Sequence, residues 1–293
     1  MQTKENILQK KAMIIHFSFK CDSGKIKDAR IKETIAEKYG ADQKLISDSK
    51  QAIAKQCTEK IMQNKNEFQT SLYKYTLPHN HKGALILPTK FYQIIMELER
   101  KASTKHVELV NEYCNNYLDY IDQAKNQLNG LFNRADYKTV DKIRKKFGWN
   151  IDLTPYPVID NFILDMAQSE VEEIKNNAQK NYTTMQEQAT AGLWARIYSA
   201  VKALSEKMNE KRQVKGQDVT PIFRDSIIGN IRELVELLPG LNILDDPALE
   251  TARQELENNL AGIEPEVLRS SEFTRQETAK KAESILNNIQ GIF

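Results

Sequence analysis

The sequence is poor in the two residues that most often interrupt regular secondary structure. Gly and Pro together account for 19 of the 293 residues. Proteins built from many short strands need frequent turns and are usually richer in both. Hydrophobic residues make up 40% of the chain and charged residues 28%, a balance that favours long, solvated helices. We therefore expect a mainly α protein with a small β element.

Cysteine is scarce, and long hydrophobic runs are missing. The three cysteines, Cys21, Cys57 and Cys114, form no CxxC pair, and an odd number cannot complete a set of disulfides. This pattern indicates a reducing compartment. No segment approaches the ~20 consecutive apolar residues that a membrane-spanning helix needs, and the apolar run near the N-terminus lacks a cleavage site. We expect a soluble, cytoplasmic protein that does not bind membranes.

The chain has only four histidines, and two of them flank an asparagine in "PHNHKGALILP", residues 78 to 88. A metal site built on His79 and His81 would need further ligands, yet no Asp or Glu occurs between Glu67 and Glu97. HNH nucleases also spread their His, Asn and His over a hairpin and a helix. Pro, Asn and Gly are turn residues, so we interpret this stretch as an exposed turn.

Signatures of catalysis are missing as well. In "DSGKI", Gly24 and Lys25 follow a predicted strand as in a phosphate-binding loop, but Phe19 and Ile26 stand where that loop needs Gly and Ser or Thr. No Ser or Cys nucleophile is recognisable with a His and an orienting carboxylate. We expect no catalytic residue, no metal and no cofactor, and hence a protein that is not an enzyme.

Local sequence patterns predict where the shorter strands and helices lie. The β-branched and aromatic run at residues 12 to 20 predicts an N-terminal strand, and "SLYKYTL" with "ALILP" on either side of the turn predicts a hairpin. A helix is expected from Lys27 to Tyr39, closed by Gly40, and another from Ser47 to Phe68.

Two helices of about 40 residues are also expected. The first runs from Pro88, which suits a first helical turn, to Gly130, with apolar residues at steps of three or four. The second begins at a capping box of Ser169 and Glu172 and ends near Lys211. Helices of this length favour an elongated, coiled-coil-like molecule that forms oligomers.

The net charge of +2 conceals an uneven distribution. Residues 1–150 carry 27 Lys and Arg against 17 Asp and Glu, whereas residues 151–293 carry 15 against 23. The extended stretch through Pro155 and Pro157 is the expected boundary between a basic N-terminal domain, residues 1–150, and an acidic C-terminal helical domain, residues 151–293. Such asymmetry indicates either a nucleic-acid-binding face or two halves that attract each other within or between chains.

The strongest candidate for a binding surface is "DYKTVDKIRKKFGW", residues 136 to 149. Basic side chains attract phosphates and aromatic side chains can stack on bases. Asp136 and Asp141 dilute the charge, however, and the spacing of Val140, Ile143 and Phe147 suits a core-facing helix, so we favour a solvated helix face over a nucleic-acid site. The residues that would bind nucleic acid or a partner are Lys138, Lys142, Arg144, Lys145, Lys146 and Trp149.

Five segments in sequential order resemble a family of phage and prophage proteins. They begin with "TLPHNHKGALILP" and "FNRADYKTVDKIRKKFGWNIDLTPYP" and continue with "LWARIYSAVKALSEKM", "FRDSIIGNIRELVELLPGLNILDDPAL" and "RQETAKKAESILNNI". The family usually has an aromatic residue where this chain has His79, and no catalytic residues are established for it. Its genes often lie near those of a MoxR-type AAA+ ATPase and a von Willebrand A domain protein.

The resemblance implies a phage-encoded protein that acts in the host cytoplasm. Together with the long helices and opposite charges, it leads us to expect a non-enzymatic interaction or assembly protein with a host or phage protein partner, which forms homo-oligomers. It could serve as an adaptor for an AAA+ ATPase or as an anti-defence protein that inhibits a host complex. The alternative is a nucleic-acid-binding protein that uses the basic N-terminal half.

Overall fold

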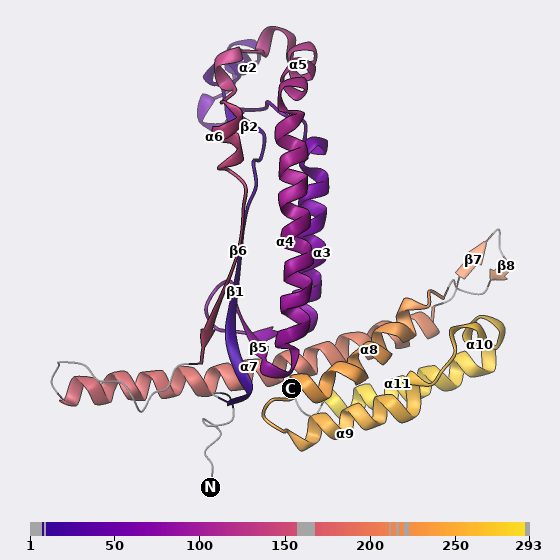
Figure 1. The fold of residues 1–293 in the computed structure, drawn as a ribbon. Coiled ribbons are helices and arrows are strands. Elements are labelled where there is room, and N and C mark those ends of the chain that lie inside the picture. Colours follow the sequence, from indigo (N-terminus) through magenta and orange to yellow (C-terminus); the bar gives the residue numbers. More distant parts are fainter. Residues whose placement is uncertain are drawn as a thin grey trace. The chain divides into compact units, whose positions relative to one another are not determined.

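The structure is a computed structural model that describes residues 8, 10–156, 168–210, 212–214, 217–219 and 223–290 (Figure 1). It confirms a mainly α protein with a small antiparallel sheet. The chain forms two compact units, each assembled from separate segments. Unit 1 consists of Met1–His16, Tyr75–Tyr92 and Leu153–Phe293, and unit 2 of Phe17–Lys74 and Gln93–Asp152.

These units differ from the two sequence halves expected as domains. The boundary near residue 150 does separate unit 2 from the last segment of unit 1, but two N-terminal segments also belong to unit 1. Positive and negative residues are therefore separated less strongly between the two units than between the two sequence halves. Unit 2 has 22 Lys and Arg against 17 Asp and Glu, and unit 1 has 20 against 23.

Short strands form a four-stranded sheet in the order β4-β5-β1-β6. The predicted N-terminal strand is β1 (Ala12–Lys20), which pairs antiparallel with β5 (Ala84–Pro88). β5 also pairs with β4 (Leu77–Pro78), and β6 is Gly148–Pro155. The expected strand "SLYKYTL" is wrong at its start, because Ser71–Lys74 finish a helix. The buried residues of this helix, Ile61, Asn64, Phe68 and Leu72, recur at steps of three and four, which is the spacing of one helix face.

Unit 1 is mainly a helical bundle. Its longest helix, α7 (Gln168–Met208), packs against α11 (Glu272–Gln290) and α8 (Ser226–Leu241). The expected end at Lys211 lies outside the described residues. Buried residues on α7 recur at steps of three or four and form its contact stripe: Leu193, Ile197, Val201 and Leu204. The remaining elements are β7 (Arg212–Val214), β8 (Gln217–Val219), α9 (Pro247–Leu256), the π-helical turn η7 (Glu257–Ala261), α10 (Pro265–Ser270) and η3 (Thr89–Phe91).

Unit 2 is built on two antiparallel helices, α3 (Glu59–Lys74) and α4 (Tyr92–Asn115). Lys60 pairs with Glu112 at 2.9 Å and Lys105 with Glu67 at 3.7 Å, so residues early in α3 meet residues late in α4. The other elements are β2 (Lys25–Lys27), α2 (Ala29–Tyr39), η1 (Gln43–Leu45), β3 (Ser49–Gln51), η2 (Lys55–Thr58), α5 (Tyr117–Leu128), η4 (Asn129–Leu131), η5 (Arg134–Asp136) and α6 (Val140–Arg144).

The first of the two expected long helices is interrupted. The run from Pro88 to Gly130 divides into η3, α4 and α5, with Asn116 between α4 and α5. The Asn116 side chain donates a hydrogen bond to the backbone oxygen of Glu112 at 3.0 Å. Asparagine disfavours helix interiors because its amide competes for backbone partners in this way. The helix expected over Ser47 to Phe68 also begins late, because Ser49–Gln51 pair with β2 as strand β3.

Candidate interaction surface

The basic residues singled out in the sequence lie on and around the short helix α6. Lys138, Lys142, Arg144 and Lys145 are exposed, and Nη1 of Arg144 donates to Oδ1 of Asn111 at 2.5 Å. Lys146 is different, because its Nζ lies 2.7 Å from Oδ1 of the buried Asp22. Four of these side chains therefore face solvent, whereas Lys146 neutralises an interior carboxylate.

Trp149 does not present its ring to solvent for stacking. It lies on β6 in a cluster with Phe17, Phe68 and His106, at ring-centroid distances of 4.8, 5.1 and 5.4 Å. Its Nε1 donates to Oε1 of Glu99 on α4 at 3.3 Å. Burial lowers the pKa of His106, so this histidine is a neutral member of the cluster. Trp149 therefore anchors β6 to the helices of unit 2.

A second basic segment, which sequence reasoning missed, lies at the same end of unit 2. Figure 1 shows α2 and β2 beside α5 and α6 at this end. Residues 20–58 and 117–148, here called the basic end, carry 16 Lys and Arg against 10 Asp and Glu. The exposed basic residues of the second segment are Lys20, Lys25, Lys27, Arg30, Lys38, Lys44 and Lys55.

A buried lysine joins the two segments of the basic end. Lys50, whose side chain is 3% exposed, donates from Nζ to Oδ2 of Asp28 at 2.7 Å and to the backbone oxygen of Leu131 at 2.6 Å. It also forms an ion pair with Oδ2 of Asp136 at 2.8 Å. Nearby, the hydroxyl of Tyr137 donates to the backbone oxygen of Ala52 at 3.0 Å. These contacts fix β3 against η4 and η5.

Asp28 holds the start of α2 in this network. Its carboxylate caps the helix by accepting from the backbone N–H of Arg30, and it accepts two further bonds from the Arg30 guanidinium. The hydrogen bonds from Arg30 and then Lys50 hold the pKa of Asp28 well below its usual range. Asp22, Asp28 and Asp136 are thus paired with Lys146, Arg30 and Lys50, so these charges cancel and the remaining exposed lysines keep the basic end positive.

Helix α2 also carries apolar side chains that its own unit leaves uncovered. None of its residues is buried, although Ile31, Ile35 and Tyr39 recur every four residues and so share one face. Tyr39 is 70% exposed, and Leu45 on the adjoining η1 is 87% exposed. Lys32 and Lys38 border this face, whereas Glu33 and Glu37 fall on the opposite side of the helix. We call Ile35, Tyr39 and Leu45 the α2 patch.

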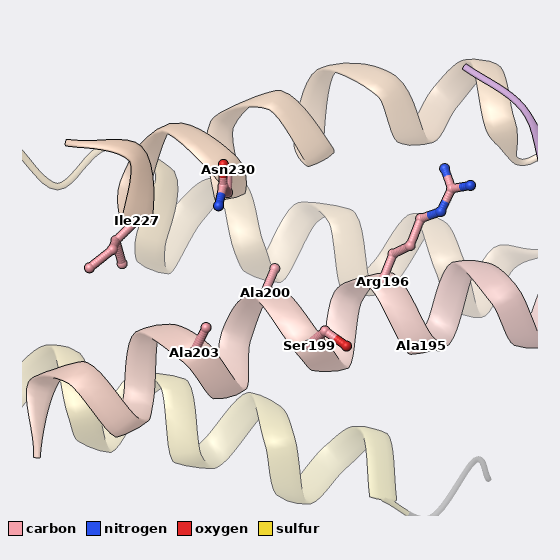
Figure 2. A pocket seen from close by; sticks show the side chains of 7 residues that line it. All are labelled: Ala195, Arg196, Ser199, Ala200, Ala203, Ile227 and Asn230. Carbon is pink, nitrogen blue, oxygen red and sulfur yellow. The ribbon is translucent and has the colours of Figure 1, made fainter. Parts of the chain in front are cut away.

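An open groove of about 470 Å³ lies between α7 and α8 in unit 1. Figure 2 shows that small side chains of α7 form one wall and that α8 contributes the other. Arg196 at this groove donates from Nη2 to the backbone oxygen of Thr76 at 2.6 Å, and burial lowers its pKa. The lining residues are Ala195, Arg196, Ser199, Ala200, Ala203, Ile227 and Asn230.

The "PHNHKG" stretch is the turn between β4 and β5. The backbone N–H of His81 donates to Nδ1 of His79 at 3.0 Å, and Gly83 has a φ of 83°. A glycine is favoured there because side chains rarely adopt positive φ. Among the residues that the structure describes, no three His, Cys, Asp or Glu side chains are grouped so that they could hold a metal ion.

We expect zinc and magnesium to leave the thermal stability of the protein unchanged, because His79 and His81 have no carboxylate to complete a coordination shell. Differential scanning fluorimetry with each metal would measure this. His79→Ala and His81→Ala should respond like the unaltered chain. A metal-dependent rise in melting temperature that both substitutions abolish would contradict the turn interpretation.

The three cysteines and Gly24, which the sequence offered as candidates for chemistry, lie in places where they contribute to packing and to a turn. Burial and the neighbouring Asp22 carboxylate raise the pKa of Cys21 to about 11, and burial raises the pKa values of Cys57 and Cys114. Thiols with raised pKa values are weak nucleophiles at neutral pH. Gly24 lies in a turn with a φ of 63°, and its backbone oxygen accepts from the N–H of Ala52 at 2.7 Å.

The geometry thus identifies the basic end and its α2 patch as the most prominent candidate surface. Within the described part of the chain, no helix combines the length and apolarity needed to cross a membrane. Comparisons of the chain with protein-family models, with curated proteins and with solved structures found no match.

Proposed function

We propose that this protein is a non-enzymatic interaction and assembly protein that binds an acidic protein surface through its basic end. One observation supports this proposal above the others: Tyr39 and Leu45 are 70% and 87% exposed within a basic surface. Large exposed apolar side chains rimmed by charge are typical of protein interfaces, where aromatic residues contribute much of the binding energy. Charges of one sign around them accelerate association with an oppositely charged partner.

The resemblance to phage proteins suggests two versions of this function. In the first, the protein is a phage-encoded adaptor or substrate of an AAA+ ATPase. In the second, it is an anti-defence protein that blocks a host immune complex. Both versions require a protein partner in the host cytoplasm, and the basic end can serve either one.

Affinity purification from infected cells, followed by binding with the purified partner, tests the proposal. The double variant Tyr39→Asp/Leu45→Asp should lose the partner, since burying two new carboxylates in an interface without cations opposite them is costly. A control variant places the same charges on exposed apolar residues elsewhere in unit 2, Met62→Asp/Val107→Asp. The control should bind like the unaltered chain. Equal partner recovery by all three proteins would exclude this surface.

Nucleic-acid binding is the second candidate function. It is favoured by the exposed side chains of Lys138, Lys142, Arg144 and Lys145 at the same end as the basic residues of segment 20–58. Each phosphate contact makes affinity fall as salt rises, because bound counterions are released. A basic face formed by two chain segments can follow a phosphate backbone.

Fluorescence anisotropy with duplex DNA and single-stranded RNA at increasing salt distinguishes this candidate. Lys142→Glu/Arg144→Glu/Lys145→Glu should weaken binding and flatten the salt dependence. Lys146 is left unchanged, because replacing it would leave the buried Asp22 carboxylate without its paired cation. Lys101→Glu/Lys105→Glu on α4 is the control for altered net charge. Absence of binding at low salt would eliminate this function.

A further inference from the structure

We propose that the α2 patch binds an acidic surface of a second copy of this chain, so that copies associate through unlike surfaces. This inference rests on the proposed interaction function and identifies the partner as a second copy. The acidic surface, here called the acidic corner, lies around Glu266, Val267, Glu272 and Phe273 of unit 1. The segment that contains it, residues 245–277, carries nine Asp and Glu against three Lys and Arg, a balance of −6. The basic end has a balance of +6.

The cations of the acidic corner are already engaged within their own unit. Arg253 pairs with Glu250 at 2.7 Å and with Glu257 at 2.8 Å. Arg269 pairs with Asp225 of the same unit.

Three carboxylates of the segment, on Asp245, Glu264 and Glu277, also pair with cations outside it. Glu266 and Glu272 form no ion pair with the described residues, so the field of the corner is negative. A positively charged partner would find exposed carboxylates there, including Glu266 and Glu272.

The acidic corner also exposes apolar side chains. Val267 on α10 is 45% exposed, and Phe273 on α11 is 74% exposed. Each directly follows one of the exposed carboxylates, Glu266 and Glu272. A surface that presents an aromatic ring beside negative charge can bury apolar area and neutralise lysines in the same contact.

Both surfaces have charged residues directly before their exposed apolar residues in the sequence, and the sign of the charge is opposite. In the basic end, Lys38 precedes Tyr39 and Lys44 precedes Leu45. In the corner, carboxylates precede the two apolar residues at the same interval along the chain. One chain therefore carries both members of a complementary pair. Nucleic acid would satisfy the lysines but leave Leu45 without an apolar partner, whereas the corner offers both kinds of contact.

This pairing limits how copies can assemble. Contact of one surface with the same surface of another copy would bring like charges together, which is unfavourable. Contact between the two different surfaces can be made reciprocally in a two-fold dimer or can continue from copy to copy in rings and open chains. Assemblies built on this unlike pair are the expected products.

Reciprocal charge reversal in the full chain tests this inference. One variant carries Lys38→Glu/Lys44→Glu and the other carries Glu266→Lys/Glu272→Lys, all at exposed positions. Sedimentation velocity should show that the unaltered protein associates as its concentration rises and dissociates in high salt. Each variant alone should associate at least about tenfold more weakly, because like charges then face each other.

An equimolar mixture of the two variants should regain association, since the acidic α2 region of one variant now meets the basic corner of the other. Lys101→Glu/Lys105→Glu is the matched control and should associate like the unaltered protein. Melting curves of the α2 and corner variants should coincide with that of the unaltered protein below the concentration at which it associates, because the altered side chains are exposed. The control loses two exposed ion pairs, Lys101 with Glu97 and Lys105 with Glu67, and should differ only slightly. A protein that remains monomeric at every concentration, or a mixture that fails to regain association, overturns the inference.

The outcome can be separated from that of the proposed function. If the unaltered chain is monomeric but Tyr39→Asp/Leu45→Asp loses a captured acidic protein, only the self-association inference is wrong. If the unaltered chain binds DNA or RNA through the α2 patch and does not self-associate, the inference is also overturned. If the unaltered chain neither self-associates nor captures an acidic protein, the proposed function is wrong as well.

Discussion

Replacing Lys50 with methionine is expected to lower the free energy of unfolding of unit 2 by about 3–5 kcal/mol, the usual cost of removing one partner from a buried ion pair. Methionine fills a similar volume but can neither donate to Asp28 and the backbone oxygen of Leu131 nor form the ion pair with Asp136; these three oxygens lie within 2.8 Å of Nζ. Asp136 would then lose its ion pair, and the Leu131 carbonyl would keep only the long contact from Arg30 at 3.5 Å.

Hydrogen exchange followed by mass spectrometry would locate this effect, which should be largest in β2, β3 and α2. Lys55→Met, at an exposed position on η2, is the control and should change exchange little. Adding Asp136→Asn to Lys50→Met should recover part of the loss, because it removes a carboxylate left without its cation. Equal exchange in the two single variants would show that Lys50 contributes no more than a surface lysine.

Asp28 adds a pH dependence to the same experiment. Its folded pKa lies below the unfolded value of about 3.9, so its contribution is present above that pH and is lost as the pH falls toward the folded value. Lys50→Met should reduce this acid sensitivity without abolishing it, because Arg30 still bonds Asp28 through both oxygens. Acid titration of stability in both proteins would measure the difference.

Gly240→Ala in unit 1 should cost about 1–3 kcal/mol, the range for inserting a methyl group into a packed core. Its added Cβ would lie within 3 Å of three ring atoms of Phe91, which is itself buried. The ring would have to leave its position against α8. On helix propensity alone, the same substitution should stabilise by roughly 1 kcal/mol, so the sign of the measured change separates packing from propensity.

Gly229→Ala on the same helix is the matched control. An added Cβ there meets no atom within 4 Å, so propensity should prevail and the free energy of unfolding should rise by roughly 0.5–1 kcal/mol. Phe91→Leu combined with Gly240→Ala should show strong coupling in a double-mutant cycle of thermal unfolding. Independent effects of Phe91→Leu and Gly240→Ala would contradict the contact.

Local sequence signals account for several of these elements. The end of α2 was predicted at Gly40 because glycine favours the left-handed conformation, and Gly40 has a φ of 62°. The turn at residues 79–83 followed from its Pro, Asn and Gly content. Both signals act within a few residues and depend little on the rest of the molecule. The mainly helical class could be predicted because glycine and proline interrupt helices locally and this chain has few of either.

Contacts between distant segments could not be predicted in this way. Ser49–Gln51 extend a polar segment that resembled the start of a helix, but pairing with β2 makes it a strand. Trp149 followed a row of lysines and suggested a stacking platform, yet the aromatic residues of β1 and α3 enclose it. In both cases the partner lies tens of residues away and leaves no mark on the local pattern.

The candidate surface also combines features that follow from the local sequence with features that depend on contacts between distant segments. The sequence by itself determined the α6 lysines and the amphipathic pattern of α2, because charge and helical spacing are properties of neighbouring residues. Only the tertiary structure decided that these segments form one basic end, through the contacts of Lys50 with Asp28 and Asp136. It also decided which side chains remain exposed, since Leu45 and Trp149 differ in burial because of the segments packed around them.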